Sequence, residues 1–208
     1  MRTVLFILLA SLVIVSCHRP EAQRIPVCCG KAAAPMASPL PDPLSANASI
    51  YQLPGVWTDQ YNRSITLNEL KGKVQVVAMI FTHCGYACPR IVQEMKAMED
   101  SLSAAERRDV GFVLVSFDAE RDDAAHLAQF AEQQGLDGRW VLLHGSPEQV
   151  RELSMLLEVR YKRLEDGNYT HSNVIVILDR NGGIEKTLPG LEPGKDSAVQ
   201  IIGRLAAR

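Results

Sequence analysis

The sequence feature that most constrains the fold of this chain is a series of apolar runs. KVQVVAMIF at 73–81 and VGFVLVSF at 110–117 are nearly continuous, and a shorter run, RWVLLHG, follows at 139–145. A strand whose two faces are both buried is apolar at almost every position, because its side chains point alternately into the two layers of the interior. We therefore expect these runs to be the central strands of one sheet.

Segments with helical periodicity follow each run. After the first run, apolar residues at 91, 95, 98 and 102 fall on one helical face, and Pro89 suits the first helical turn. ERDDAAHLAQFAEQQG at 120–135 has acidic residues in its first turn and a glycine at its end, as helices often do. SPEQVRELSMLLEVR at 146–160 opens with the capping-box pair Ser146 and Gln149. We expect a helix in each segment and an amphipathic helix at 194–207.

The C-terminal part of the chain contains a hairpin pattern. NVIVILDRNGGIEKTL at 173–188 is typical of two strands around a turn, and short strands before residue 73 extend the sheet at its N-terminal side. The resulting order of strands and helices predicts an α/β fold, with helices flanking a mostly parallel central sheet that ends in the hairpin. The most economical interpretation is a thioredoxin-like fold.

The N-terminus predicts export to a membrane surface. Residues 1–17, MRTVLFILLASLVIVSC, combine a basic residue, an apolar run too short for a comfortable bilayer crossing, and a final cysteine. This signal peptide resembles the lipobox of bacterial lipoproteins, in which the cysteine, here Cys17, becomes the lipidated first residue. The predicted location is the periplasmic side of a bacterial membrane, and a plain anchor helix is the alternative.

The segment after this cysteine predicts a tether. Residues 18–49 hold six of the eleven prolines and show no apolar period, so we expect a semi-extended linker before a folded domain at 50–208. With 208 residues, 47% of them hydrophobic, the chain suits one such domain plus a short appendage. Its formal net charge of −2 gives no electrostatic basis for binding nucleic acid. We expect a monomer.

Two cysteines, Cys84 and Cys88, lie in FTHCGYACP at 81–89, where a helix follows the first buried strand. The free N–H groups and the positive dipole end of that helix stabilise a thiolate, so we expect at least one acidic thiol. In an oxidising periplasm, two such thiols form a disulfide unless they are reduced or hold a metal. A redox pair, a metal site and two inert core cysteines are therefore the alternatives.

The spacer between the cysteines bears on these alternatives. Thioredoxin-type enzymes use two intervening residues, whereas this chain has three, which permits a disulfide and also leaves room for a metal. Thiolates are soft ligands that suit Cu(I) or Zn(II). Structural zinc takes four protein ligands, and no other close Cys/His pair supplies the remaining two, so copper fits better than zinc.

A third ligand is predicted at His171, in EDGNYTHSNVIVILD just before the hairpin. In thioredoxin-like folds the loop before this strand lies beside the dithiol, where oxidoreductases place a cis-proline. The chain has no proline between Val159 and Thr187, and it has a histidine in that loop. This pattern favours a metal ligand over a thiol-exchange site; a surface histidine in a polar loop is the alternative.

Three motifs together resemble the Sco/SenC family of copper-binding, thioredoxin-like proteins. They are FTHCGYACP, matching the family's C-x3-C-P after an F-T tail, then SFDAERDD, and then THSNVIVILD, in which a small residue follows the histidine. The resemblance covers residues 50–208. One departure is Gly85, where the family often has proline, and Cys28 and Cys29 in the tether match no part of the pattern.

The resemblance implies a copper ion, as Cu(I) or Cu(II), bound by Cys84, Cys88 and His171, with Asp118 close to the site. It also implies a metallochaperone rather than an enzyme. The recipient would be the Cu-A subunit of cytochrome c oxidase or another periplasmic copper protein. The rival hypotheses use the same cysteine pair as a redox disulfide, in a thiol:disulfide oxidoreductase or in a redox or copper sensor.

Overall fold

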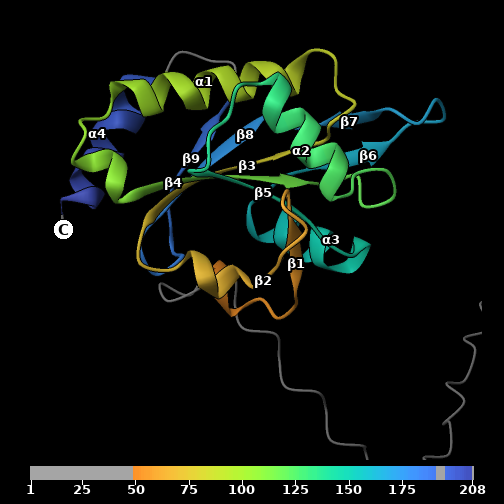
Figure 1. Cartoon of the computed structure of the whole chain (residues 1–208), viewed down its shortest axis with the longest axis horizontal. Coiled ribbons are helices and arrows are strands. Elements are labelled where there is room, and N and C mark those ends of the chain that lie inside the picture. The colour runs from red at the N-terminus through yellow and green to blue at the C-terminus, as the bar shows by residue number, and fades with distance from the viewer. Residues whose placement is uncertain (1–48, 191–194, 208) are drawn as a thin grey trace, which may run out of the picture. The chain divides into compact units, whose positions relative to one another are not determined.

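The apolar runs form the centre of a seven-stranded sheet in the computed structural model, which describes residues 49–190 and 195–207 (Figure 1). The strand order is β2-β1-β5-β4-β3-β8-β9. The three central strands are β3 (Val74–Ile80), β4 (Val110–Ser116) and β5 (Trp140–His144), and all three run parallel. Every residue of β3 and β4 is buried, as their nearly continuous apolar sequences predict.

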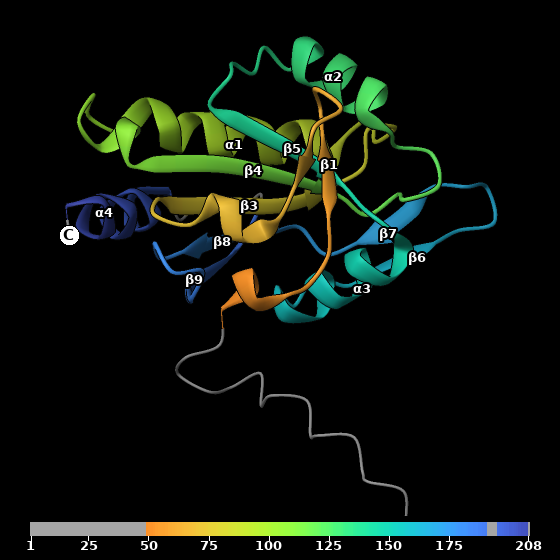
Figure 2. The ribbon, with the colours of Figure 1, turned by 60° about the horizontal axis from the view of Figure 1, so that its bottom comes forward.

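Antiparallel strands complete the sheet on both sides. The short strands β1 (Trp57–Asp59) and β2 (Ser64–Ile65) extend it beyond β5, and the hairpin of β8 (Val174–Leu178) and β9 (Ile184–Pro189) extends it beyond β3. Figure 2 shows β5, β4, β3 and β8 side by side in this order. The predicted thioredoxin-like α/β fold is confirmed. Its parallel part is the three central strands, and the sheet as a whole is mixed.

Helices cover both faces of the sheet. Two of them, α1 (Ala87–Ser101) and α2 (Ala124–Gln133), lie on one face, where α1 packs against α4 (Lys195–Ala206); α3 (Pro147–Leu156) lies on the other face (Figure 1). The predicted apolar face of α1 is buried, with Ile91 and Met95 fully covered. The capping box of Ser146 and Gln149 begins α3 as predicted.

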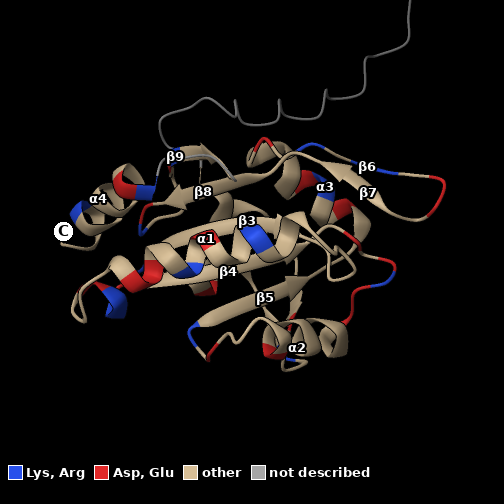
Figure 3. Cartoon of the chain, turned by 90° about the horizontal axis from the view of Figure 1, so that it is seen from above, with Lys and Arg blue, Asp and Glu red and all other residues tan. Residues whose placement is uncertain are grey.

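A second, two-stranded sheet projects beyond the main one and was not predicted. It is the hairpin of β6 (Tyr161–Arg163) and β7 (Tyr169–His171), in which Tyr161 is paired with His171. The tip of this hairpin carries acidic residues, drawn in red in Figure 3, whereas acidic and basic residues are interspersed over the rest of the ribbon. Its strands have only three residues each and carry mostly polar side chains, so their local pattern does not predict strands.

The chain enters the domain beside the turn between β8 and β9. The backbone N–H of Ile50 donates a 3.1 Å hydrogen bond to the carbonyl of Gly182 in that turn. Gly182 has φ +83°, which favours glycine, and a β-carbon there would lie 2.6 Å from the Tyr51 ring and from the Ser49 hydroxyl. The turn lies by the amino end of β3, because Leu178 is paired with Gln75.

The predicted signal peptide at 1–17 and almost all of the predicted tether lie outside the described residues, and so do Cys17, Cys28 and Cys29. Within residues 49–190 and 195–207, no helix combines the length and the hydrophobicity that crossing a membrane requires.

Candidate metal centre

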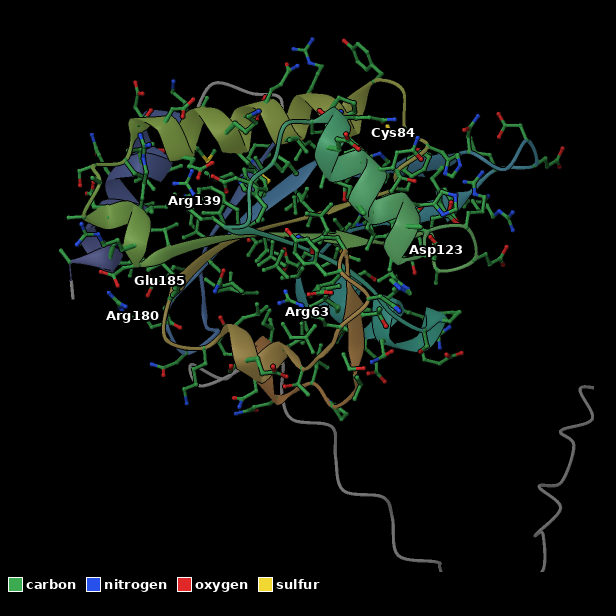
Figure 4. All side chains as sticks on the ribbon, in the orientation of Figure 1. Arg63, Cys84, Asp123, Arg139, Arg180 and Glu185 are labelled. Carbon is green, nitrogen blue, oxygen red and sulfur yellow. The ribbon has the colours of Figure 1, made fainter. Side chains whose placement is uncertain are left out.

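The two cysteines lie between the end of β3 and the first turn of α1. Cys84 is in the connecting loop, where its N–H donates to the carbonyl of Phe81 at 3.2 Å, and Cys88 is the second residue of α1. The backbone N–H of Cys88 points at the Cys84 sulfur, 3.3 Å away. Figure 4 shows Cys84 at this end of α1. Cys84 is half-buried, whereas Cys88 is 0% exposed, and the two thiols are not joined in a disulfide.

His171, the last residue of β7, completes a group of three. Its Nε2 lies 4.0 Å from the Cys88 sulfur, and the sulfurs of both cysteines and a ring nitrogen all lie within 4.8 Å of one another. The other ring nitrogen, Nδ1, lies 3.3 Å from the carbonyl of Ser172 and donates to it. This assignment leaves the lone pair of Nε2 directed at the sulfurs, as a metal ligand requires.

Aromatic side chains hold the imidazole in place. The ring of His171 lies 5.9 Å from that of Phe81, edge to face, and 5.1 Å from that of Phe117. Phe117 in turn stacks on Tyr161, at 5.1 Å, and contacts Tyr169. This wall joins the β6–β7 hairpin to the main sheet and shields one side of the site from water, which strengthens electrostatic interactions within it.

The two thiols differ in acidity. A hydrogen bond from the Cys88 thiol lowers the pKa of Cys84 to about 3, against the opposing effect of partial burial, and hydrogen bonds from the backbone N–H groups of Cys88 and Tyr86 also lower it. The same hydrogen bond and its own burial raise the pKa of Cys88. The exposed Cys84 is therefore the thiolate and the buried Cys88 is its proton donor, which agrees with the expectation of at least one acidic thiol.

Asp118 does not approach the sulfurs directly, but it holds the strand that carries His171. Its carboxylate is 0% exposed, and it accepts hydrogen bonds from the guanidinium of Arg121 and, at 3.2 Å, from the hydroxyl of Tyr169. Tyr169 lies in β7, two residues before His171. The carboxylate therefore fixes the β6–β7 hairpin against the end of β4.

Asp122 fixes the loop that carries Cys84, a role that the sequence did not reveal. Its carboxylate accepts hydrogen bonds from the backbone N–H and the hydroxyl of Thr82, at 2.9 and 2.6 Å, and from the hydroxyl of Ser116, at 2.6 Å. The residue is 3% exposed. Asp122 lies within the SFDAERDD motif, which marks this segment as a place to look for functional residues. Nothing in the sequence connects it with Thr82, which lies forty residues earlier.

The donor set fits a soft or borderline metal ion. Two sulfurs and one imidazole nitrogen suit copper or zinc, whereas oxygen-seeking ions such as Mg²⁺ and Ca²⁺ prefer carboxylates and carbonyls. All three donors already face one point, and Cys84 and His171 remain partly exposed. The site can therefore hold an ion with few protein ligands and still be reached from outside.

Comparisons with known proteins agree with this geometry. The family model described as SCO1/SenC matches residues 47–207. A curated relative, the SCO1 protein homolog of Bacillus subtilis, is 27% identical over 143 residues, which are 67% of this chain and 74% of that protein.

Two solved structures are similar over the whole domain. The copper-bound structure of ScoI from Bradyrhizobium japonicum is 26% identical with a TM-score of 0.59, over 74% of this chain and 98% of that one. BsSco, described as having a disulfide switch and as a member of the Sco family of cytochrome c oxidase assembly proteins, is 25% identical with a TM-score of 0.65, over 74% of this chain and 92% of that one. With its family model spanning the entire folded domain, this chain belongs to the SCO1/SenC family.

Proposed function

We propose that this protein is a copper carrier that holds one copper ion as cargo between Cys84, Cys88 and His171. The observation that carries the proposal is the convergence of two sulfurs and an imidazole nitrogen within 4.8 Å at one end of the sheet. The copper-bound structure of a relative supports copper as the metal.

The donor set favours copper over zinc for a physical reason. Structural zinc takes four protein ligands, whereas Cu(I) accepts two soft sulfurs and tolerates a third ligand. With both thiols ionised, Cu(I) gives a first shell with a net charge of −1 and Cu(II) gives a neutral one, and the imidazole of His171 helps the site to accept Cu(II). A site with so few ligands releases its ion by ligand exchange, which a carrier needs.

The proposal extends to delivery and location. The recipient is the Cu-A subunit of cytochrome c oxidase or another periplasmic copper protein, and the support is the description of BsSco as a member of an oxidase-assembly family. A lipid on Cys17 anchors the protein to the periplasmic side of a bacterial membrane, and the support is the lipobox-like sequence at 1–17.

A thiol-reducing role is a second candidate, and one observation favours it. Cys84 is an accessible thiolate, and Cys88 lies behind it as a buried thiol with a raised pKa. An attacking thiolate followed by a resolving thiol is the arrangement that disulfide exchange requires. In that role Cys84 attacks a partner disulfide, forms a mixed disulfide and releases one partner thiol. Cys88 then attacks the Cys84 sulfur and releases the second partner thiol, so the partner is reduced and the pair ends as a Cys84–Cys88 disulfide.

The decisive experiment is a Cu(I) titration of a chain that begins at residue 47, which omits Cys17, Cys28 and Cys29. The reduced protein is titrated anaerobically against a competing chelator. We expect one tightly held copper ion, lost in Cys84→Ser and Cys88→Ser and weakened about tenfold or more in His171→Ala.

His144→Ala is the matched control, because His144 ends β5 and lies outside the three-residue group. Unchanged copper affinity in His171→Ala would refute the three-ligand site. If copper does not bind while the dithiol still reacts with disulfides, the thiol-reducing role takes the place of the carrier role.

A further inference from the structure

A second cluster of potential ligands lies on the other side of the Cys84 loop. A ring nitrogen of His83 and carboxylate oxygens of Asp118 and Asp122 all lie within 4.8 Å of one another. These carboxylates are buried, and both already accept hydrogen bonds from neighbouring side chains. They need no metal ion to satisfy them, so we do not take them as ligands.

The carboxylate of Asp122 instead orients the imidazole of His83. Its oxygen lies 3.5 Å from Nδ1 of His83, and the hydroxyl of Thr82 lies 3.2 Å from the same nitrogen. Because the Thr82 hydroxyl uses its proton on Asp122, at 2.6 Å, it accepts the proton of Nδ1. The protonated Nδ1 faces inward, and Nε2 of His83 keeps its lone pair.

His126, in the first turn of α2, has a related arrangement, in which a carboxylate accepts the Nδ1 proton directly. Its Nδ1 donates to the carboxylate of Asp123 at 2.7 Å, and this carboxylate also caps the helix by accepting the His126 backbone N–H at 2.9 Å. Nε2 of His126 therefore also keeps its lone pair. A histidine whose Nδ1–H is bound by a carboxylate is the arrangement found at protein metal sites, since it fixes the tautomer and raises the basicity of Nε2.

The two imidazoles lie close together and line the same hollow. Their ring centres are 5.7 Å apart, at an interplanar angle of 41°. Two imidazoles on one tetrahedral ion, with metal–nitrogen bonds of about 2.0–2.1 Å, have centres roughly 5–6 Å apart. The hollow has a volume of about 160 Å³, and its lining residues are Thr82, His83, His126, Gln129, Phe130 and Gln133. That volume admits an ion with a few waters, at about 30 Å³ for each water.

We propose that His83 and His126 form a second metal site, which binds a divalent cation of the class that prefers imidazole, Zn²⁺ or Cu²⁺, through the two Nε2 atoms. Water fills the remaining positions, and Gln129 lines the same hollow. Both histidine side chains are nearly half exposed, at 45% and 43%, so the ion exchanges with solvent.

This site is separate from the thiol site in its ligands and its chemistry. His83 and Cys84 are consecutive, yet the imidazole turns towards Asp122 and α2, whereas the sulfur turns towards Cys88 and His171. The two-imidazole site offers borderline nitrogen donors to divalent ions, and the thiol site offers soft sulfurs. The inference does not depend on the proposed copper-carrier function.

The test uses the full chain with Cys84→Ser and Cys88→Ser, which removes the thiol site, and Zn²⁺ as the probe. Equilibrium dialysis counts the bound zinc in this background and in the same background with His126→Ala or His83→Ala. We expect each histidine variant to lose the same one equivalent of zinc, and the double variant to lose no more. We also expect side-chain NMR to show Nε2 of His83 and His126 shifting together on addition of Zn²⁺.

His144→Ala in the same background is the matched control, and we expect it to keep the full zinc count. His126→Ala retains the Asp123 cap, because the backbone N–H remains, so loss of folding is not expected. Zinc binding that is equal in His126→Ala and in the background would overturn the site. An equal loss in His144→Ala, or an Nε2 shift in only one of the two histidines, would overturn it as well.

Discussion

The backbone N–H of Thr82 donates a 2.9 Å hydrogen bond to the carboxylate of Asp122, forty residues further along the chain. This bond joins the loop after β3 to the segment after β4. Thr82 lies in that loop, two residues before Cys84. The bond determines where the loop leaves the sheet, and therefore where the Cys84 thiolate lies. Neighbouring parallel strands make the contact possible, since Ile80 and Ser116 are paired at their ends.

Asp122→Ala should weaken both the fold and the thiol site. The substitution leaves the Thr82 N–H and the Ser116 hydroxyl without their acceptor in a buried place, at a cost of about 2–4 kcal/mol in the free energy of unfolding. Chemical denaturation measures this loss, and Cu(I) competition should show a lower affinity. Asp123→Ala is the control: it removes an exposed cap, so it should cost less stability than Asp122→Ala and leave the Cu(I) affinity unchanged.

Tyr169→Phe should loosen the strand that carries His171. The substitution removes the hydroxyl that donates to Asp118. This loss should lower the free energy of unfolding by about 0.5–1.5 kcal/mol. It should also weaken Cu(I) binding, because His171 is then held less firmly. Tyr161→Phe keeps the ring that stacks on Phe117 and is the control. Equal Cu(I) affinities in the two variants would contradict a positioning role for the Tyr169–Asp118 bond.

Cys84 should react with iodoacetamide at a rate that is nearly constant between pH 5 and pH 8. The lowered pKa of about 3 keeps it a thiolate throughout this range. Because its pKa is lower in the folded than in the unfolded protein, ionisation stabilises the fold most at high pH, and this contribution is lost as the pH falls towards 3. Mass spectrometry should find the label on Cys84 and not on Cys88.

Cys88→Ala should restore a pH dependence to that reaction. It removes the thiol whose hydrogen bond is the largest cause of the lowered Cys84 pKa, so the labelling rate should fall at low pH. Cys88→Ser supplies a hydroxyl donor in place of the thiol, so its labelling rate should fall less at low pH. A rate in Cys88→Ala that stays flat down to pH 5 would assign the acidity to the helix terminus instead.

Gly182→Ala should destabilise the domain by about 2–4 kcal/mol. Its φ of +83° strains any side chain, and the new methyl group would overlap the Tyr51 ring, 2.6 Å away. Thermal and chemical denaturation measure the change. Gly138→Ala is the control, because a β-carbon at that position meets nothing within 4 Å. Equal stabilities of the two variants would show that the turn adapts.

The strands and helices of the main domain were predictable because each has a local signal. β3 and β4 are nearly continuous apolar runs, and α1 shows its buried face in the spacing of Ile91, Met95 and Met98. His171 was predictable because a histidine stood where oxidoreductases of this fold place a proline. The order β2-β1-β5 at one side of the sheet had no such signal, since it depends on contacts between distant segments.

The β6–β7 hairpin and the role of Asp122 were not predictable for the same reason. The strands of the hairpin have three residues each, and they are held by the aromatic rings of Phe81 and Phe117, which directly follow β3 and β4. The three hydrogen bonds of Asp122 reach Thr82 and Ser116 only after the sheet has formed. Whether Cys84, Cys88 and His171 bind copper, with Asp118 in support, stays a prediction until the titration is made.

The hydrogen bond between Ile50 and Gly182 fixes the start of the domain at one end of the sheet. The turn that contains Gly182 lies by the amino end of β3, and Cys84 follows the carboxyl end of the same strand. Residue 49 therefore joins the domain at the pole opposite to the thiols. A lipid anchor upstream, as proposed, would be attached through the end of the domain opposite to the thiols, so the attachment itself would not occupy the thiol end.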